Sequence, residues 1–91
     1  MPTAQQEVEI VNRLGLHARA AAKFAAVASE YGAEITVRRG DREVNGKSIM
    51  GLMMLAAARG ASITIVCNGH DADAALNRLT GLVAGRFEEE E

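Results

Sequence analysis

Two short segments carry the residue types that could handle phosphate, and the first is Gly15-Leu16-His17-Ala18-Arg19. It lies where an extended segment gives way to an alanine-rich helix. The start of a helix has unpaired backbone N–H groups and a partial positive charge, so it favours anions, phosphate above all. The ring of His17 could take a phosphoryl group there, and Arg19 is placed to pair with phosphate oxygens. These two residues are therefore the first candidates for a functional site.

A lone histidine in a small domain is more often a surface or capping residue. Three local features favour the phosphate role: the helix dipole keeps a ring lone pair available, Arg19 is near, and Gly15 lets the backbone turn sharply. Such a helix start stabilises an anion by about 0.3–1 kcal/mol, whereas enzymes lower barriers by ~8 kcal/mol or more. No carboxylate lies near His17 in the sequence, and no metal-ligand cluster is evident. The residues therefore predict a phosphate carrier without cofactor or metal, whose chemistry a partner completes.

The second segment is Asn45-Gly46-Lys47-Ser48-Ile49-Met50. As a helix N-cap, Ser48 would contribute about 1 kcal/mol of stability and needs no further role. A phosphate on this serine would also be accommodated at a helix start and would change the surface charge. Both interpretations stay open on the residues alone.

Apolar residues follow Ser48 in a helix too short to bury them all. We expect some of Ile49, Met50 and Met53 to be exposed, and exposed flexible apolar side chains suit contact with several partners. A loosely packed core edge is the competing interpretation, and it has comparable weight.

The elements that must position these residues can be read from the polar and apolar pattern. Alternation predicts strands at residues 7–10, 34–38, 42–45 and 62–67, with a two-residue turn at Gly40-Asp41. Helical spacing predicts helices from residue 18 to about 31, from 48 to about 58, and a last one that Asp71 caps. The order β-α-β-β-α-β-α predicts an α+β fold, an antiparallel sheet with helices on one side.

Composition bounds the class of protein. Its 91 residues suit one domain, and 48% hydrophobic with 24% charged residues indicates a soluble globular chain. The one cysteine, Cys67, lies in an apolar run and is expected to be buried. There is no signal-peptide pattern and no apolar run that could span a bilayer, so we expect a cytoplasmic protein without a membrane partner.

Charge is distributed unevenly along the chain. The run 88–91 holds four of the twelve acidic residues, so residues 1–87 carry ten Lys and Arg against eight Asp and Glu. We expect this acidic end to be a solvated, frayed tail. A weakly basic body with almost no aromatic residues speaks against nucleic acid and for an acidic protein partner.

Both segments and the order of elements resemble the HPr family, the histidine-containing phosphocarriers of the bacterial phosphoenolpyruvate phosphotransferase system. The likeness spans residues 1–91 as a single HPr domain with an acidic tail at 88–91. It implies an open-faced β-sandwich, with a four-stranded antiparallel sheet in the order 1-4-2-3 and three helices on one face. It also implies a monomer.

The resemblance implies roles for the site residues. His17 would accept phosphate on Nδ1 from phosphorylated enzyme I and pass it to an enzyme IIA domain, with help from Arg19. Ser48 matches a regulatory serine that an HPr kinase/phosphorylase modifies in lineages that have one. The partner-binding surface would comprise Ala18, Lys47, Ile49, Met50 and Met53.

This chain also departs from the family pattern. Ala20 stands where a proline is usual, and several lysines of the binding face are missing. The segment 12–15 and the acidic tail are more like the nitrogen-branch relatives. Two alternatives are a purely regulatory HPr-like protein acting through Ser48 and the apolar patch, and a small-ligand binding module. His17 speaks against the first, and the lack of convergent polar groups against the second.

Overall fold

The computed structural model describes residues 2–91, and its helices and strands follow one another in the predicted order. The strands are β1 (Thr3–Glu9), β2 (Glu34–Arg39), β3 (Arg42–Asn45) and β4 (Ser62–Asn68). The helices are α1 (Ala18–Ala28), α2 (Ile49–Met54) and α3 (Ala72–Ala84), followed by a 3₁₀ turn, η1 (Arg86–Glu88). The strands form one antiparallel sheet in the order β1-β4-β2-β3, which confirms the expected topology.

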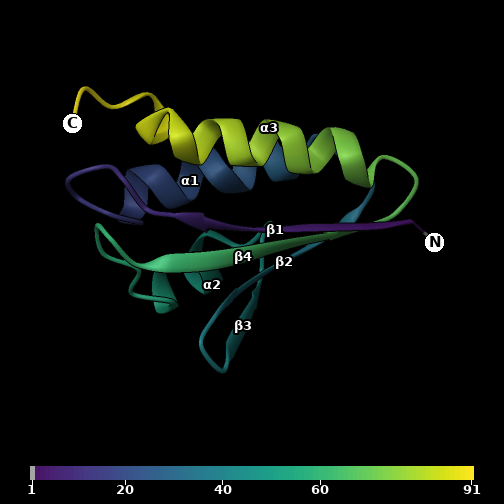
Figure 1. Ribbon diagram of the computed structural model, residues 1–91, viewed down its shortest axis with the longest axis horizontal. Helices are drawn as coiled ribbons and strands as arrows, with labels where there is room; N and C mark the ends of the chain where they lie inside the picture. The colour runs from purple at the N-terminus through teal and green to yellow at the C-terminus, as the bar shows by residue number, and fades with distance from the viewer. Residues whose placement is uncertain (1) are drawn as a thin grey trace.

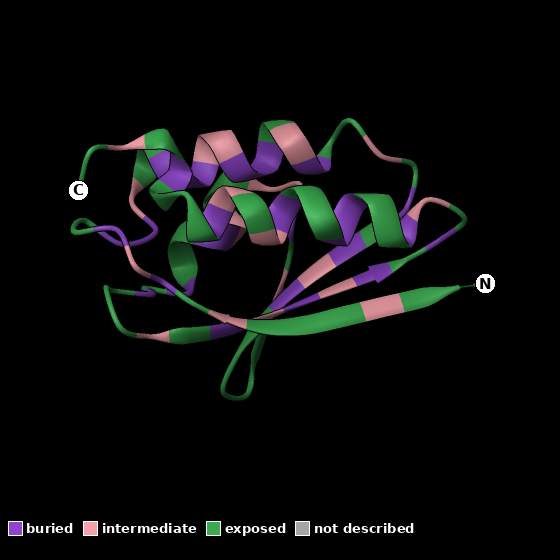
Figure 2. Ribbon diagram, turned by 45° about the horizontal axis from the view of Figure 1, so that its top comes forward, coloured by how far each residue is buried: buried purple, intermediate pink, exposed green. Residues whose placement is uncertain are grey.

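The core lies between the sheet and the helices. Figure 1 shows α1 and α3 side by side along the sheet, and in Figure 2 their buried stretches turn toward the strands. Helix α2 packs against α1 and β3. The fully buried larger side chains come from every layer, and they include Phe24, Ile63, Ile65, Leu79 and Phe87. Alanines in α1 let the helix lie close to its neighbours, so the core needs few aromatic rings. Cys67 is buried, as predicted.

Helix α1 ends earlier than its apolar spacing predicts. Its last regular residue is Ala28, three before Tyr31. The N–H of Glu30 bonds to the Val27 carbonyl at 3.0 Å, and that of Tyr31 to the Ala28 carbonyl at 3.2 Å. Bonds of this i to i−3 kind tighten the last turn, so the chain continues to coil without remaining an α-helix.

Helix α2 also ends early, at Met54 rather than near Ala58. Ala56 has φ +51°, which takes the chain out of the right-handed helix. Two guanidinium groups from the β2–β3 hairpin bind the last carbonyls: Arg39 reaches Leu55 at 3.0 Å, and Arg42 reaches Met54 at 2.6 Å. These contacts between distant segments satisfy carbonyls that have no partner within the helix.

Asp71 precedes α3 as predicted, but its side chain does not cap the helix. Its carboxylate accepts hydrogen bonds from the backbone N–H of Gly32 at 2.8 Å and of Ala33 at 2.9 Å. These two bonds hold the pKa of Asp71 below its usual value, against a smaller opposing effect of desolvation. The residue thus joins the start of α3 to the entrance of β2.

The first strand is longer than its alternating segment. It begins at Thr3 because β4 supplies partners along its whole length, from Thr3 opposite Asn68 to Glu9 opposite Ser62.

Within residues 2–91, no helix is both long enough and apolar enough to cross a bilayer.

Candidate functional site

His17 stands at the N-cap of α1, as predicted. Its backbone is extended (φ −78°, ψ −178°), and its carbonyl accepts the N–H of Ala21 at 2.8 Å. The side chain does not bond to the N–H groups of the first turn and keeps 29% of its surface exposed. The ring is therefore accessible, and it leaves the amides of the first turn to another acceptor.

The loop before α1 is fixed from two sides. Gly15 has φ +67°, and a Cβ at this position would come within 2.6 Å of the Ala57 carbonyl oxygen. The N–H of Leu16 donates to that same oxygen at 2.9 Å, and the buried Asn12 donates its Nδ2 to the Gly15 carbonyl at 2.8 Å. Only glycine fits both the left-handed backbone and the close approach.

A carboxylate lies against His17, although none is near it in the sequence. Oε2 of Glu89 is 2.5 Å from Nε2 of His17, and Oε1 of Glu89 accepts Nδ2 of Asn12 at 3.0 Å. The Glu89 side chain is only 14% exposed. Desolvation acts to raise the pKa of this carboxyl, but the hydrogen bonds from His17 and Asn12, together with the charges of His17 and Arg19, lower it overall. Glu89 is therefore ionised at neutral pH.

The acidic end of the chain is largely solvated, as expected, since Glu88, Glu90 and Glu91 are exposed. It is not frayed, however, because its side chains bond to Lys23 and His17. Phe87 is fully buried and anchors the turn after α3. Glu88 pairs with Lys23 at 3.0 Å, and the Glu91 carbonyl accepts the N–H of Arg13. In Figure 1 the C-terminus lies at the same end of the molecule as the loop between β1 and α1. Sequence reasoning gave the tail no tertiary role, and the aromatic residue just before it was the one available signal.

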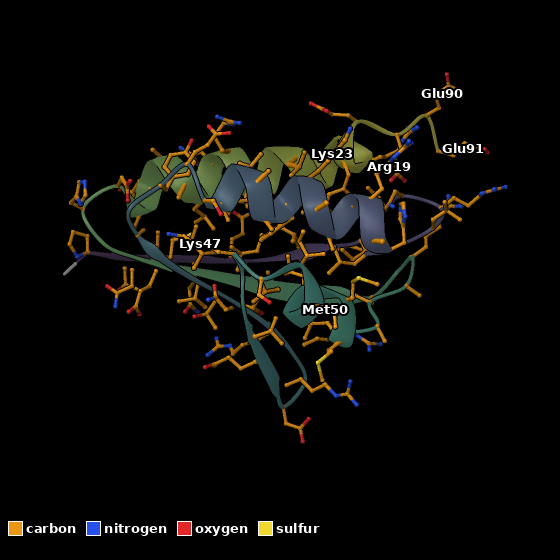
Figure 3. All side chains as sticks on the ribbon, turned by 180° about the vertical axis from the view of Figure 1, so that it is seen from behind. Arg19, Lys23, Lys47, Met50, Glu90 and Glu91 are labelled. Carbon is orange, nitrogen blue, oxygen red and sulfur yellow. The ribbon has the colours of Figure 1, made fainter. Side chains whose placement is uncertain are left out.

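Basic side chains border the same open hollow as His17. It is lined by Arg13, Arg19, Lys23 and the segment 88–91. Figure 3 shows Arg19 and Lys23 on the side of α1 that faces Glu90 and Glu91. Arg19 is exposed, so its guanidinium can turn toward an anion at the helix start. The structure thus brings together His17 and Arg19 and adds Asn12 and Glu89.

Ser48 caps α2, as one of the two open interpretations predicted. Its Oγ accepts the N–H of Gly51 at 3.0 Å, and the residue is half-buried. Lys47 beside it donates Nζ to the Tyr31 carbonyl at 2.7 Å, which ties α2 to the end of α1.

Exposed apolar side chains lie on α2 and in the loop before α1. Ile49, Met50 and Met53 are all exposed, Met50 to 73%, while Leu52 and Leu55 hold the helix in the core. Figure 3 shows Met50 on the outer side of α2. Met54 and Leu14 are also exposed, to 66% and 60%, and were not predicted from the sequence; Ala18 is exposed too. The exposure expected for Ile49, Met50 and Met53 is therefore confirmed.

Within residues 2–91, no group of three or more His, Cys, Asp or Glu side chains is arranged to hold a metal ion. The chemistry available at the site is that of an accessible imidazole beside a carboxylate, a guanidinium and a helix start.

A family model described as the PTS HPr component phosphorylation site matches residues 4–85. The chain belongs to the HPr family. Members of this family are phosphocarrier proteins of the phosphotransferase system rather than catalysts, as the sequence predicted.

Relatives within the HPr family match nearly the whole chain. The phosphocarrier protein HPr of Neisseria meningitidis is 52% identical over 87 residues, covering 96% of this chain and 98% of the relative. The phosphocarrier protein NPr of Shewanella violacea is 46% identical over 89 residues, covering 98% of each. Among solved structures, HPr-C-His from Thermoanaerobacter tengcongensis superposes with a TM-score of 0.93 at 38% identity, covering 97% of this chain and 99% of that one.

Proposed function

We propose that His17 is the residue that carries the phosphoryl group, taking it from phosphorylated enzyme I and passing it to an enzyme IIA domain. The observation that carries this proposal is the accessible ring of His17 at the start of an 11-residue helix. The ring makes no hydrogen bond to the backbone amides of the first helical turn. A helix start favours a phosphate beside it. Membership of a family defined by its phosphorylation site supports the same assignment.

The transfer itself requires an uncharged ring. The lone pair of one ring nitrogen forms a bond to phosphorus while the bond from phosphorus to the donor's leaving group breaks. The helix start and Arg19 then stabilise the bound dianion, and the helix start supplies about 0.3–1 kcal/mol of this. Stabilisation of this size holds a transferable phosphoryl group without trapping it, and the partner supplies the rest of the catalytic groups.

The proposal is tested with enzyme I and phosphoenolpyruvate. Wild type should gain an acid-labile phosphate, and His17→Ala should gain none. His70→Ala is the matched control, because His70 is the second of two histidines and lies exposed in the turn before α3. Equal labelling of His17→Ala would refute the assignment.

Partners would dock on the apolar patch beside the site. Ile49, Met50 and Met53 are exposed on the helix that packs against α1, so a bound partner would bury them next to His17. Met50→Asp should raise the KM of enzyme I for this protein and leave the fold intact. Gln5→Asp adds the same charge on the exposed part of β1 and should leave KM unchanged.

A second candidate function is regulatory phosphorylation of Ser48 by an HPr kinase/phosphorylase. It is favoured by the position of Ser48 at a helix start next to the exposed patch, where a phosphate would change the charge that partners meet. The hydroxyl must leave Gly51 to be modified. Incubation with such a kinase and ATP should give an acid-stable phosphate on wild type; its survival in Ser48→Ala would exclude this serine.

A further inference from the structure

The ring of His17 is held through one nitrogen by a chain of hydrogen bonds that reaches the loop before the helix. Nε2 of His17 is 2.5 Å from Oε2 of Glu89. Oε1 of Glu89 is 3.0 Å from Nδ2 of Asn12, which also donates to the Gly15 carbonyl at 2.8 Å. Both oxygens of the carboxylate are thus engaged, one by the ring and one by a buried amide.

The orientation of the Asn12 amide is fixed by its neighbours. The Gly15 carbonyl and Oε1 of Glu89 are both acceptors, so the NH₂ group must face them and uses both of its protons. Oδ1 of Asn12 is buried and has no hydrogen-bond partner within residues 2–91. A flipped amide would set an oxygen against two acceptors. Asn12 therefore acts as a donor toward Glu89.

The backbone delivers Glu89 to this position through an unusual turn. Arg86, Phe87 and Glu88 have φ values of +60°, +54° and +66°, so three successive residues are left-handed. Side chains other than glycine rarely adopt this conformation unless surrounding contacts impose it. The buried Phe87 ring and the Glu88–Lys23 ion pair supply such contacts.

A carboxylate without a proton can only accept a hydrogen bond, so Nε2 of His17 must donate one. A neutral imidazole has a single N–H, and placing it on Nε2 leaves the lone pair on Nδ1. We infer that Glu89 is a positioning residue, oriented by Asn12, that selects Nδ1 as the nucleophilic nitrogen of His17. The inference rests on the proposed phosphate-carrying role of His17 and adds a residue from the C-terminal segment to it.

The same contact favours the phosphorylated ring. A phosphoryl group on Nδ1 draws electrons from the ring, so the proton on Nε2 becomes more acidic and its hydrogen bond to Glu89 stronger. The carboxylate approaches Nε2 and not Nδ1, so it supports the ring without occupying the reacting nitrogen.

The substitution Glu89→Gln gives a sharp test because a glutamine amide has one oxygen and one NH₂ group. Asn12 donates to one of these positions, so the oxygen of the glutamine should turn to Asn12 and its NH₂ group to His17. The NH₂ group then donates to Nε2, which moves the ring proton to Nδ1. Loss of the correct tautomer at a catalytic histidine is known to be costly when a carboxylate is replaced by its amide.

The tautomer is measured from the ¹⁵N resonances of the His17 ring at pH 8, well above the ordinary imidazole pKa of about 6.5. Wild type should show the proton on Nε2, Glu89→Gln should show it on Nδ1, and Glu89→Ala should show a mixture. The rate of phosphoryl acceptance from enzyme I should fall by about tenfold in Glu89→Gln and by less in Glu89→Ala. A purely structural role predicts the opposite order, because glutamine preserves shape better than alanine.

Glu90→Gln is the matched control, since it removes the same charge from an exposed neighbour in the same tail. It should change neither the tautomer nor the rate. An unaltered tautomer in Glu89→Gln would overturn the inference, and so would a faster rate, which would mean that the tail obstructs the site. If wild type accepts no phosphate while Glu89→Gln still moves the ring proton, the carrier assignment of His17 fails and the positioning of its ring stands.

Discussion

Replacing Phe87 with alanine should test how the C-terminal segment is attached to the domain. The ring is fully buried, and it is the only large apolar group of the segment from 85 to 91. It lies between α3 and the docked acidic residues, so the turn that carries Glu89 depends on it. We expect Phe87→Ala to destabilise the protein and to release the tail from His17.

The magnitude follows from the burial and the backbone. An aromatic ring buries roughly 150–250 Å², which at about 25 cal/mol per Å² corresponds to roughly 4–6 kcal/mol. Alanine retains part of this, and Phe→Ala changes in cores cost about 3–5 kcal/mol. The lower end applies here, because without the ring Arg86 and Glu88 can leave left-handed conformations that cost of order 1 kcal/mol each.

The assays are urea unfolding and thermal unfolding, each followed by far-UV circular dichroism. A loss of about 3 kcal/mol should lower the melting temperature by about 12 °C or more in a domain of this size. Phe87→Leu is the control, since it keeps an apolar anchor and should cost about 1.5 kcal/mol or less. In the folded Phe87→Ala protein, the ring nitrogens of His17 should resonate as they do in Glu89→Ala. A stability loss below about 1 kcal/mol, or unchanged ring resonances, would refute this account of the tail.

Substitutions at three further positions test the surrounding fold. Gly81→Ala should raise the free energy of unfolding by about 0.5–1 kcal/mol in a urea titration. Gly81 lies inside α3 with open space around it, and alanine restricts the unfolded chain. A lower free energy of unfolding would show that the position is not open. Ser48→Ala should cost about 1 kcal/mol by the same measurement, because the N–H of Gly51 loses its cap, and Ser48→Asp should recover most of it. The Asp71 carboxyl has a lowered pKa in the folded state, so its contribution is present above the ordinary value of 3.8 and is lost as the pH falls below it. Asp71→Asn should therefore be less stable at pH 7 and should lose less stability than wild type on acidification; parallel pH profiles would contradict this.

The sequence by itself determined the elements and most of the site. The spacing of apolar residues located the strands and helices. A half-buried strand or helix has apolar residues on its buried face, and these recur with the period of that element. The residues at the start of α1 and α2 could be identified for a local reason, since a helix N-terminus needs acceptors whatever else surrounds it. His17 and Ser48 accordingly stand where their segments predicted.

Tertiary structure decided the ends of elements and the partner of His17. Helix α2 stops at Met54, where Ala56 leaves the right-handed helix and arginines from another segment bind the last carbonyls. Glu89 is 72 residues from His17 in the chain, and a run of four glutamates in sequence is typical of a solvated end. Only the burial of Phe87 between distant elements brings one of them to the imidazole. Local spacing fixes which groups a helix presents, whereas a contact between the two ends of a chain depends on the packing of everything between them.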